Sequence, residues 1–148
     1  MKASSFEIRV ARLNELPDAP EITQPGNAAQ YWQTAIEKMP WFIADREICV
    51  ALTVNTQSRV TGHHLVSIGT LNETVVHSRE VFRAAVAMNA YGVVLMHNHP
   101  SGGVDPSDAD KRMTDRLAKA ADILQIKMLD HVIVAAGRWF SFREAGLL

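Results

Sequence analysis

The sequence contains one cysteine, no long apolar run and no excess of charge of either sign. A lone Cys49 excludes an internal disulfide and every zinc site built from two or more thiolates. Fifteen basic and sixteen acidic residues give a formal net charge of −1, and no basic run marks a nucleic-acid surface. No apolar stretch approaches the roughly 18 residues that cross a bilayer, and the start lacks the apolar region of a secretory signal. We therefore expect a cytoplasmic protein with no membrane association and no clear nucleic-acid surface.

Along the sequence, segments whose apolar residues have the spacing of a strand alternate with segments whose apolar residues have the spacing of a helix. Of its 148 residues 47% are hydrophobic, which suffices for one domain with a sizeable core. Alternating or short apolar runs predict strands at 47–54, 60–69, 91–96 and 131–142, the first half-buried and the last divided at Gly137. Helical spacing predicts helices at 27–39, at 78–90 and from 107 onward, with Asn27, Ser78 and Ser107 as N-caps. Because strands and helices are interleaved, the predicted fold is α/β with a mixed central sheet flanked by helices.

The first 26 residues are expected to form an appendage to a domain at 27–148. The stretch "LPDAPEITQPGN" holds three of the six prolines and separates a strand candidate at 6–13 from the first helix. The sequence shows no internal repeat and no low-complexity tract.

Residues 95–110, "LMHNHPSGGVDPSDAD", gather the chemistry-bearing side chains. In an extended segment, residues two apart share a side, so His97 and His99 are able to direct both imidazoles at one point. The loop "PSGGVDP" then leads to a helix whose third position is Asp110, which brings a carboxylate beside the histidines. Two imidazoles and a carboxylate leave one tetrahedral position of Zn²⁺ for water, as in catalytic zinc sites. The cluster predicts a zinc site of hydrolytic type.

Each part of this cluster also has an ordinary structural interpretation. Ser107 and Asp110 form the S-x-x-D pattern of a capping box, which needs no catalytic role, and both interpretations are compatible. An isolated H-x-H pair also occurs by chance in polar loops. The remaining histidines have no partner at ligand spacing and are predicted to be hydrogen-bonded structural residues: His63, His64, His77 and His131.

The segment "HNHPSGGVDPSDAD" fits H-x-H-x7-S-x2-D and resembles the metal motif of JAMM/MPN+ metallopeptidases, most closely their bacterial RadC-like branch. The stretches "VSIGTLNETVVHSREVFRAAV", "LDHVIV" and "SFREAGLL" extend the resemblance over about 27–148. It implies an MPN/JAB-like fold, with the layering of cytidine deaminases, and zinc held by His97, His99 and Asp110. It also implies that Ser107 polarises or stabilises the oxyanion and that an upstream glutamate, matched here by Glu47, is the general acid and base.

Two departures from the family pattern are visible. Ser78 stands where proline is usual, and the helix-hairpin-helix region that often precedes the domain in full-length relatives is not in this sequence. The second departure removes the main sequence reason for a link to DNA.

Glu47, Glu73 and Glu80 compete for the role of the base. Glu80 falls in the first turn of a helix, where the helix dipole accounts for it, and Glu73 lies in the polar loop "TLNET". Glu47 begins an apolar strand, so it is the predicted base, although a solvent-facing strand end beside Asp45 and Arg46 is the alternative.

Three functions remain open on the sequence. The favoured one is a zinc peptidase acting on a peptide or isopeptide bond of a protein substrate. The others are a metal-dependent nuclease, disfavoured by the near-neutral charge, and a catalytically silent interaction scaffold.

Overall fold

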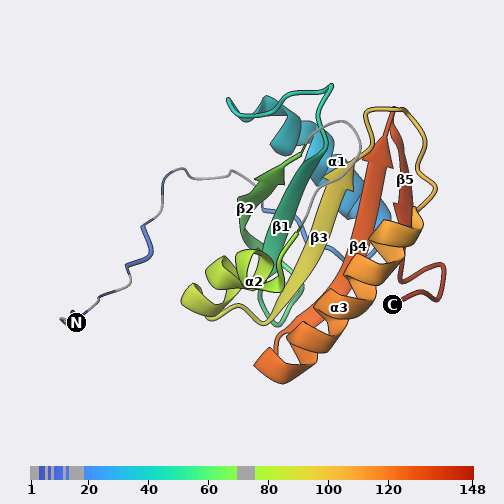
Figure 1. Ribbon diagram of the computed structural model, residues 1–148. Coiled ribbons are helices and arrows are strands. Elements are labelled where there is room, and N and C mark those ends of the chain that lie inside the picture. Colours follow the sequence, from blue (N-terminus) through green and yellow to red (C-terminus); the bar gives the residue numbers. More distant parts are fainter. Residues whose placement is uncertain (1–3, 6, 8, 12, 14–18, 70–75) are drawn as a thin grey trace.

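The fold is built on a five-stranded mixed sheet with strand order β2-β1-β3-β4-β5 (Figure 1). This computed structural model describes residues 4, 5, 7, 9–11, 13, 19–69 and 76–148. The strands are β1 (Ile48–Val54), β2 (Val60–Ile68), β3 (Gly92–Asn98), β4 (Lys127–Ala135) and β5 (Arg138–Ser141). The β3–β4 pair is parallel, while β1 pairs antiparallel with both β2 and β3, and β4 with β5. The predicted α/β fold with a mixed central sheet is confirmed, and the predicted strand at 131–142 is divided at Gly137 into β4 and β5.

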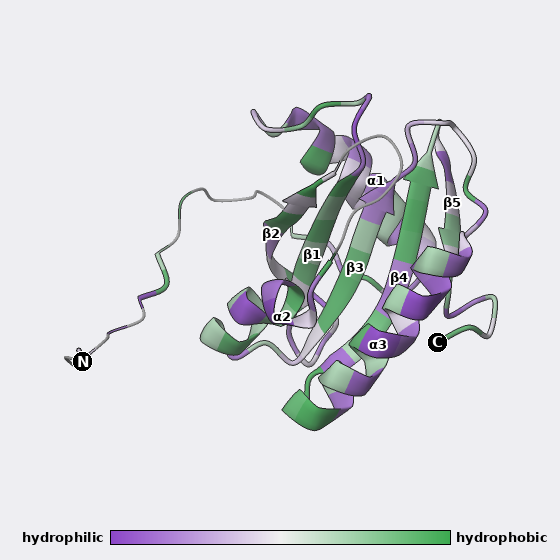
Figure 2. Cartoon of the chain, viewed as in Figure 1, coloured by the Kyte–Doolittle hydropathy of each residue, from purple (hydrophilic) through white to green (hydrophobic). Residues whose placement is uncertain are grey.

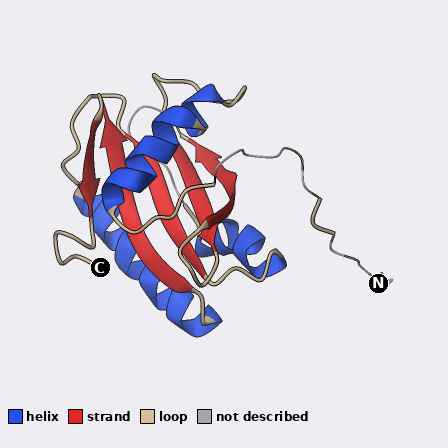
Figure 3. Ribbon diagram, turned by 180° about the vertical axis from the view of Figure 1, so that it is seen from behind, coloured by secondary structure: helices blue, strands red, loops and turns tan. Residues whose placement is uncertain are grey.

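Helices cover both faces of this sheet (Figures 1 and 3). Helix α1 (Pro25–Thr34) and the 3-10 turn η1 (Ile36–Lys38) pack on one face, and α2 (Ser78–Ala87) and α3 (Asp108–Leu124) on the other. Each face therefore has its own apolar cluster, and the strands between them are the most hydrophobic part of the chain (Figure 2). Strands β3 and β4 are parallel and are connected through α3. The helix therefore begins near the carboxyl end of β3 and leads back to the start of β4.

Strand β1 is buried on both faces, so the prediction of a half-buried strand was wrong. Val50 and Leu52 lie in the cluster under α1, and Cys49 and Ala51 in the cluster under α2 and α3. The alternation that suggested a polar face is an alternation of large and small side chains. Small residues on the second face leave room for two helices to approach the sheet.

Two of the predicted helix N-caps were also wrong. Helix α1 begins at Pro25 with Gln24 as N-cap, and Asn27 is the third helical residue whose side chain accepts from the Gln24 amide. Proline at the first helical position fixes the dihedral angle φ that the helix needs and lacks the N–H that would be unpaired there. Helix α2 begins at Ser78 itself, with His77 as N-cap. The predicted cap of α3 at Ser107 is confirmed.

Residues 20–22 run beside the hairpin that joins β1 and β2. The Ile22 amide donates to the Ser58 carbonyl at 2.8 Å, the Val60 amide donates to the Pro20 carbonyl at 2.9 Å, and Ile22 is buried. Of the strand candidate at 6–13, residues 6, 8 and 12 lie outside the described residues, and the others are not in a strand. The domain boundary at residue 26 stays a prediction.

Among the described helices, none combines the length and the apolar character that crossing a bilayer requires.

Gly92 permits the close approach of β3 to β4 where the two strands begin. A Cβ atom at this position would lie 2.9 Å from the Lys127 carbonyl oxygen and 3.3 Å from Leu129 Cγ. We expect Gly92→Ala to lower the free energy of unfolding by about 1–3 kcal/mol, the usual cost of overpacking, in urea denaturation. Gly103→Ala is the matched control, since a Cβ there meets nothing within 4 Å. Equal stability of the two variants would contradict this close-approach role.

Candidate metal centre

The carboxyl end of β3 presents two imidazoles on the sheet face covered by α2 and α3. His97 lies inside the strand and is 1% exposed, and the His99 amide continues the pairing with β4 by donating to the Val134 carbonyl at 3.0 Å. Both residues share the strand parity of Leu95, which belongs to the cluster under α3. The predicted direction of the two side chains toward one point is confirmed.

The first turn of α3 supplies the carboxylate. The Ser107 hydroxyl accepts from the Asp110 amide at 3.1 Å, and the Ser107 amide donates back to Asp110 Oδ2 at 2.8 Å, so the predicted capping box is present. The Ser107 hydroxyl proton also goes to Asp110 Oδ2, at 2.7 Å. Two of these contacts hold the Asp110 carboxylate and the third holds its backbone amide, so one serine fixes the residue in place.

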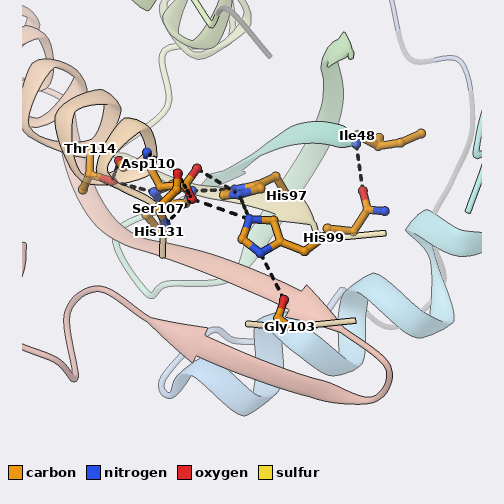
Figure 4. Close-up of polar contacts among 9 residues, drawn as sticks. Ile48, His97, His99, Gly103, Ser107, Asp110, Thr114 and His131 are labelled. Atoms are coloured by element: carbon orange, nitrogen blue, oxygen red, sulfur yellow. Dashed lines mark hydrogen bonds and ion pairs between the residues drawn. The ribbon is translucent and has the colours of Figure 1, made fainter. Parts of the chain in front are cut away.

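These residues converge closely (Figure 4). The Nε2 atoms of His97 and His99 are 3.0 Å apart, and Asp110 oxygens lie 3.3 Å from the first and 3.5 Å from the second. All the ligand atoms of this set lie within 4.8 Å of one another. His97, His99 and Asp110 thus form a possible metal-binding site of the predicted composition.

The electrostatics of the site favour a positive charge among these groups. Burial by itself would raise the pKa of Asp110, but the interactions of its carboxylate with the His97 and His99 rings outweigh it and hold that pKa well below its ordinary value. The hydrogen bond with Asp110 raises the pKa of His99 above its ordinary value, against the effect of burial, and the nearby charge of Glu47 adds to this rise. A carboxylate anion is therefore stable here and attracts a cation.

His99 is oriented from its outer side by the loop that follows it. Its Nδ1 donates to the Gly103 carbonyl at 3.0 Å, so Nε2 is the ring nitrogen that faces His97 and Asp110. The loop turns tightly, with the Gly102 amide donating to the His99 carbonyl at 3.1 Å and Gly102 at φ +86°, where glycine is favoured. Arg138 donates to the Gly102 carbonyl at 2.6 Å and so ties the loop to β5.

His131 and Thr114 are part of the site, and the sequence did not predict their place. His131 is hydrogen-bonded, as predicted, but its Nε2 lies 2.8 Å from Nδ1 of the candidate ligand His97. Its Nδ1 lies 2.6 Å from the Thr114 hydroxyl, which donates to the Asp110 carbonyl at 2.8 Å. Only the parallel pairing of β3 with β4 brings residue 131 here, so no local spacing could have indicated it.

Of the other histidines, His63 and His64 have hydrogen-bond partners, as expected of structural residues, and His77 is the N-cap residue of α2. His63 Nδ1 is 2.7 Å from the Tyr31 hydroxyl, and His64 Nε2 is 3.1 Å from the Glu80 carbonyl.

Glu47 is half-buried, at the end of β1 nearest the site. The β1–β3 pairing ends with Cys49 opposite His97, and Glu47 precedes Cys49 by two residues at this end of β1. The charge of Glu47 acts on the pKa values of both Cys49 and His99. Of its competitors, Glu73 lies outside the described residues, and Glu80 forms surface ion pairs with Arg79 at 3.5 Å and Arg83 at 3.4 Å.

Comparison with known proteins agrees with this geometry. The family model for the RadC-like JAB domain matches residues 22–147. The chain belongs to the RadC-like JAB domain family. Relatives include UPF0758 proteins of Chlorobaculum parvum, 47% identical over 118 residues (78% of this chain and 53% of that protein), and of Histophilus somni strain 2336, 38% identical over 134 residues (90% and 58%). A UPF0758 protein of Chlorobium chlorochromatii is 48% identical over 103 residues, which are 70% of this chain and 46% of that protein. The chain thus spans about half the length of these curated relatives.

In this RadC-like JAB domain a cavity of about 270 Å³ opens beside His99, at the α1 side of the sheet edge. Its walls are of mixed character: Trp32 and Phe42 are among the apolar residues, while Glu37 and Arg138 supply charge. The site is therefore bordered by a space that is large enough for part of a bound molecule.

In this RadC-like JAB domain, Asn98 lies between the two histidines and holds the backbone on either side of Glu47. Asn98 accepts from the Ile48 amide at 2.7 Å through its side-chain oxygen and donates to the Arg46 carbonyl at 2.9 Å. The residues on both sides of Glu47 are thereby tied to the strand that carries His97 and His99. The amide of Asn98 is 7% exposed, so water does not readily replace it.

We expect Asn98→Ala to lower the free energy of unfolding by about 1–3 kcal/mol, because the buried Ile48 amide loses its acceptor. Asn55→Ala is the matched control: its side chain also accepts from two backbone amides, at 3.0 Å each, but at an exposed turn. Urea denaturation of both variants in chelator measures the difference. A smaller loss for Asn98→Ala than for Asn55→Ala would contradict the bracing role.

Proposed function

We propose that this domain is a zinc-dependent metallopeptidase that hydrolyses a peptide or isopeptide bond in a protein substrate. The observation that carries the proposal is the convergence of His97 Nε2, His99 Nε2 and the Asp110 carboxylate within 4.8 Å. Two imidazoles and one carboxylate form the ligand set of open catalytic zinc sites, in which the fourth position stays available for water.

The donor chemistry supports zinc more than the hard cations. Mg²⁺ and Ca²⁺ prefer oxygen ligands, whereas imidazole nitrogen suits Zn²⁺. When neither Nε2 atom carries a proton, their lone pairs repel at 3.0 Å, and a cation bound between them would remove that repulsion. Bound zinc would supply a Lewis acid that polarises a carbonyl and lowers the pKa of water to about 7.

Glu47 is the proposed general base and acid. Its position two residues before Cys49, the partner of His97, and its charge effect on the pKa of His99 support a carboxylate that reaches the site. In this role Glu47 accepts a proton from the attacking water and passes it to the amine that leaves. The bonds of Asn98 to the residues on either side of Glu47 would hold its backbone in place during both transfers.

Ser107 is the proposed donor to the oxyanion that forms on the attacked carbonyl. In the structure its hydroxyl proton goes to Asp110 Oδ2, so donation to a substrate oxygen requires the hydroxyl to rotate. The Ser107 amide bond to the same oxygen, at 2.8 Å, would keep Asp110 in place while the hydroxyl turns. Capping and catalysis by Ser107 are therefore compatible.

A protein or peptide is the substrate class that the surroundings favour. The cavity beside His99, with Trp32 and Phe42 in its wall, suits an apolar side chain next to the bond that is cleaved. A net charge of −1 gives little attraction for the phosphates that a nuclease must bind. Retention of all three ligand types argues against a silent scaffold.

The metal assignment predicts one Zn²⁺ per chain, measured by elemental analysis of protein purified without added metal. His99→Ala and Asp110→Ala should each lose most of it, because the two remaining ligands hold zinc weakly. Ser107→Ala should keep the metal, since the backbone amide still orients Asp110, and lose about 10²-fold in rate as an oxyanion donor does. Stoichiometric zinc in both ligand variants would exclude this metal site.

Glu47→Gln should retain zinc and fold while losing roughly 10²- to 10⁴-fold in the rate of hydrolysis, the usual contribution of a positioned acid or base. Glu80→Gln is the matched control and should remain near wild type, because the Glu80 carboxylate pairs with the surface residues Arg79 and Arg83. Glu73→Gln should also remain near wild type. A fully active Glu47→Gln together with an inactive Glu80→Gln would overturn the choice of base and leave the metal site unaffected.

Activity itself is tested with the zinc-loaded protein and a broad peptide library that includes isopeptide-linked members, with cleavage detected by mass spectrometry. We expect a defined set of products that chelator abolishes. An uncut library would favour the scaffold, and cleavage of DNA by the zinc-loaded protein would favour the nuclease.

A further inference from the structure

A buried hydrogen-bonded chain leads from α3 through β4 to the candidate ligand His97. Thr114 and His131 are both 0% exposed, and the His131 ring stacks on Phe142 with centroids 4.5 Å apart and an interplanar angle of 9°. His131 Nδ1 faces the Thr114 hydroxyl at 2.6 Å, and its Nε2 faces His97 Nδ1 at 2.8 Å (Figure 4). Packing therefore fixes the ring plane, and hydrogen bonds occupy both of its nitrogens.

The direction of each hydrogen bond in this chain follows from the first donor. A threonine hydroxyl has one proton, and that of Thr114 goes to the Asp110 carbonyl at 2.8 Å. Its oxygen is then left to accept a hydrogen bond from the N–H at His131 Nδ1. A neutral imidazole carries one N–H, so Nε2 of His131 is an acceptor, and His97 must donate to it from Nδ1.

These hydrogen-bond directions also determine whether Nε2, the other ring nitrogen of His97, carries a proton. With its proton on Nδ1, neutral His97 has a free lone pair on Nε2, the atom 3.0 Å from His99 Nε2 and 3.3 Å from Asp110 Oδ1. If His131 carried its proton on Nε2 instead, His97 would have to accept at Nδ1 and would present an N–H to the ion. Only one of the two tautomers of His131 permits His97 to bind a metal.

We propose that Thr114 and His131 are positioning residues that set the His97 tautomer required for metal binding. The inference rests on the proposed function only in taking His97, His99 and Asp110 as the ligands of a Zn²⁺ ion. This series of hydrogen bonds starts at the backbone carbonyl of one ligand, Asp110, and ends at the ring of another, His97. It therefore connects the start of α3 with the end of β3. His99 has its own separate orienting partner, the Gly103 carbonyl.

The test compares Thr114→Val, which keeps the shape and removes the hydroxyl, with Thr114→Ser, which keeps the hydroxyl. Competition with a chelator measures the affinity of the full chain for Zn²⁺ alone. We expect Thr114→Val to bind zinc about 10- to 100-fold more weakly, as is usual when a residue that supports a ligand is lost, and Thr114→Ser to remain within about threefold of wild type. Thermal unfolding of both variants in chelator records any loss of stability separately.

A second measurement needs no variant. Nitrogen NMR of the histidine rings in the zinc-loaded wild-type protein should place the His131 proton on Nδ1 and the His97 proton on Nδ1. A proton on His131 Nε2 would overturn the proposal whatever the variants do. Equal zinc affinity of Thr114→Val and wild type, with both proteins folded, would overturn it as well.

The results separate this inference from the proposed function. If no peptide is cleaved but Thr114→Val loses zinc affinity and Thr114→Ser keeps it, the peptidase proposal fails and the inference stands. If wild type cleaves peptides and binds zinc no better than Thr114→Val, the inference alone fails. A wild-type protein that binds no zinc refutes both.

Discussion

Two imidazole nitrogens held 3.0 Å apart beside a carboxylate impose the constraint on which the rest of the site depends. Lone pairs at this separation repel unless a cation or a proton lies between them. Contacts on the opposite side of each ring, from His131 to His97 and from Gly103 to His99, must therefore hold the rings in place. A strand buried on both faces supplies the rigidity, since β3 is paired on each side and covered by helices. A flexible loop with the same three residues would relax and separate them.

The Asp110 carboxylate is held beside the two rings because Asp110 lies in the first turn of α3. Asp110 is only 6% exposed, and an isolated buried carboxylate is costly. The capping box lowers that cost because two backbone amides and the Ser107 hydroxyl are paired within it. The same contacts place Asp110 toward the histidines, so a device that stabilises the helix also orients a ligand. For this reason the S-x-x-D pattern could not by itself distinguish a cap from a metal site.

The sequence predicted what depends on local spacing and missed what depends on strand pairing. His97, His99, Ser107 and Asp110 lie within one strand, loop and helix start, where the period of a strand and the chemistry of an N-cap determine positions. His131 lies on a different strand, and its contact with His97 exists only because β4 pairs parallel with β3. The burial of β1 was missed for a related reason. Cys49 and Ala51 look like the exposed side of an amphipathic strand until two helices are known to cover them.

The alternation of side chains along β3 divides the work of the site between the two faces of the sheet. His97 and His99 point to the α3 face, where Asp110 meets them, while Asn98 has the opposite parity, shared with Met96 of the cluster under α1, and binds the backbone on both sides of Glu47. Three consecutive residues therefore fix the ligands and the neighbour of the proposed base together. A shift of β3 by one residue against β1 would exchange the two faces and remove the ligands and the brace at once. Register of the central strand pair is thus a condition for any chemistry at this edge, and the buried Asn98 amide, which accepts from Ile48 at 2.7 Å, is a contact between β3 and β1 that such a shift would break.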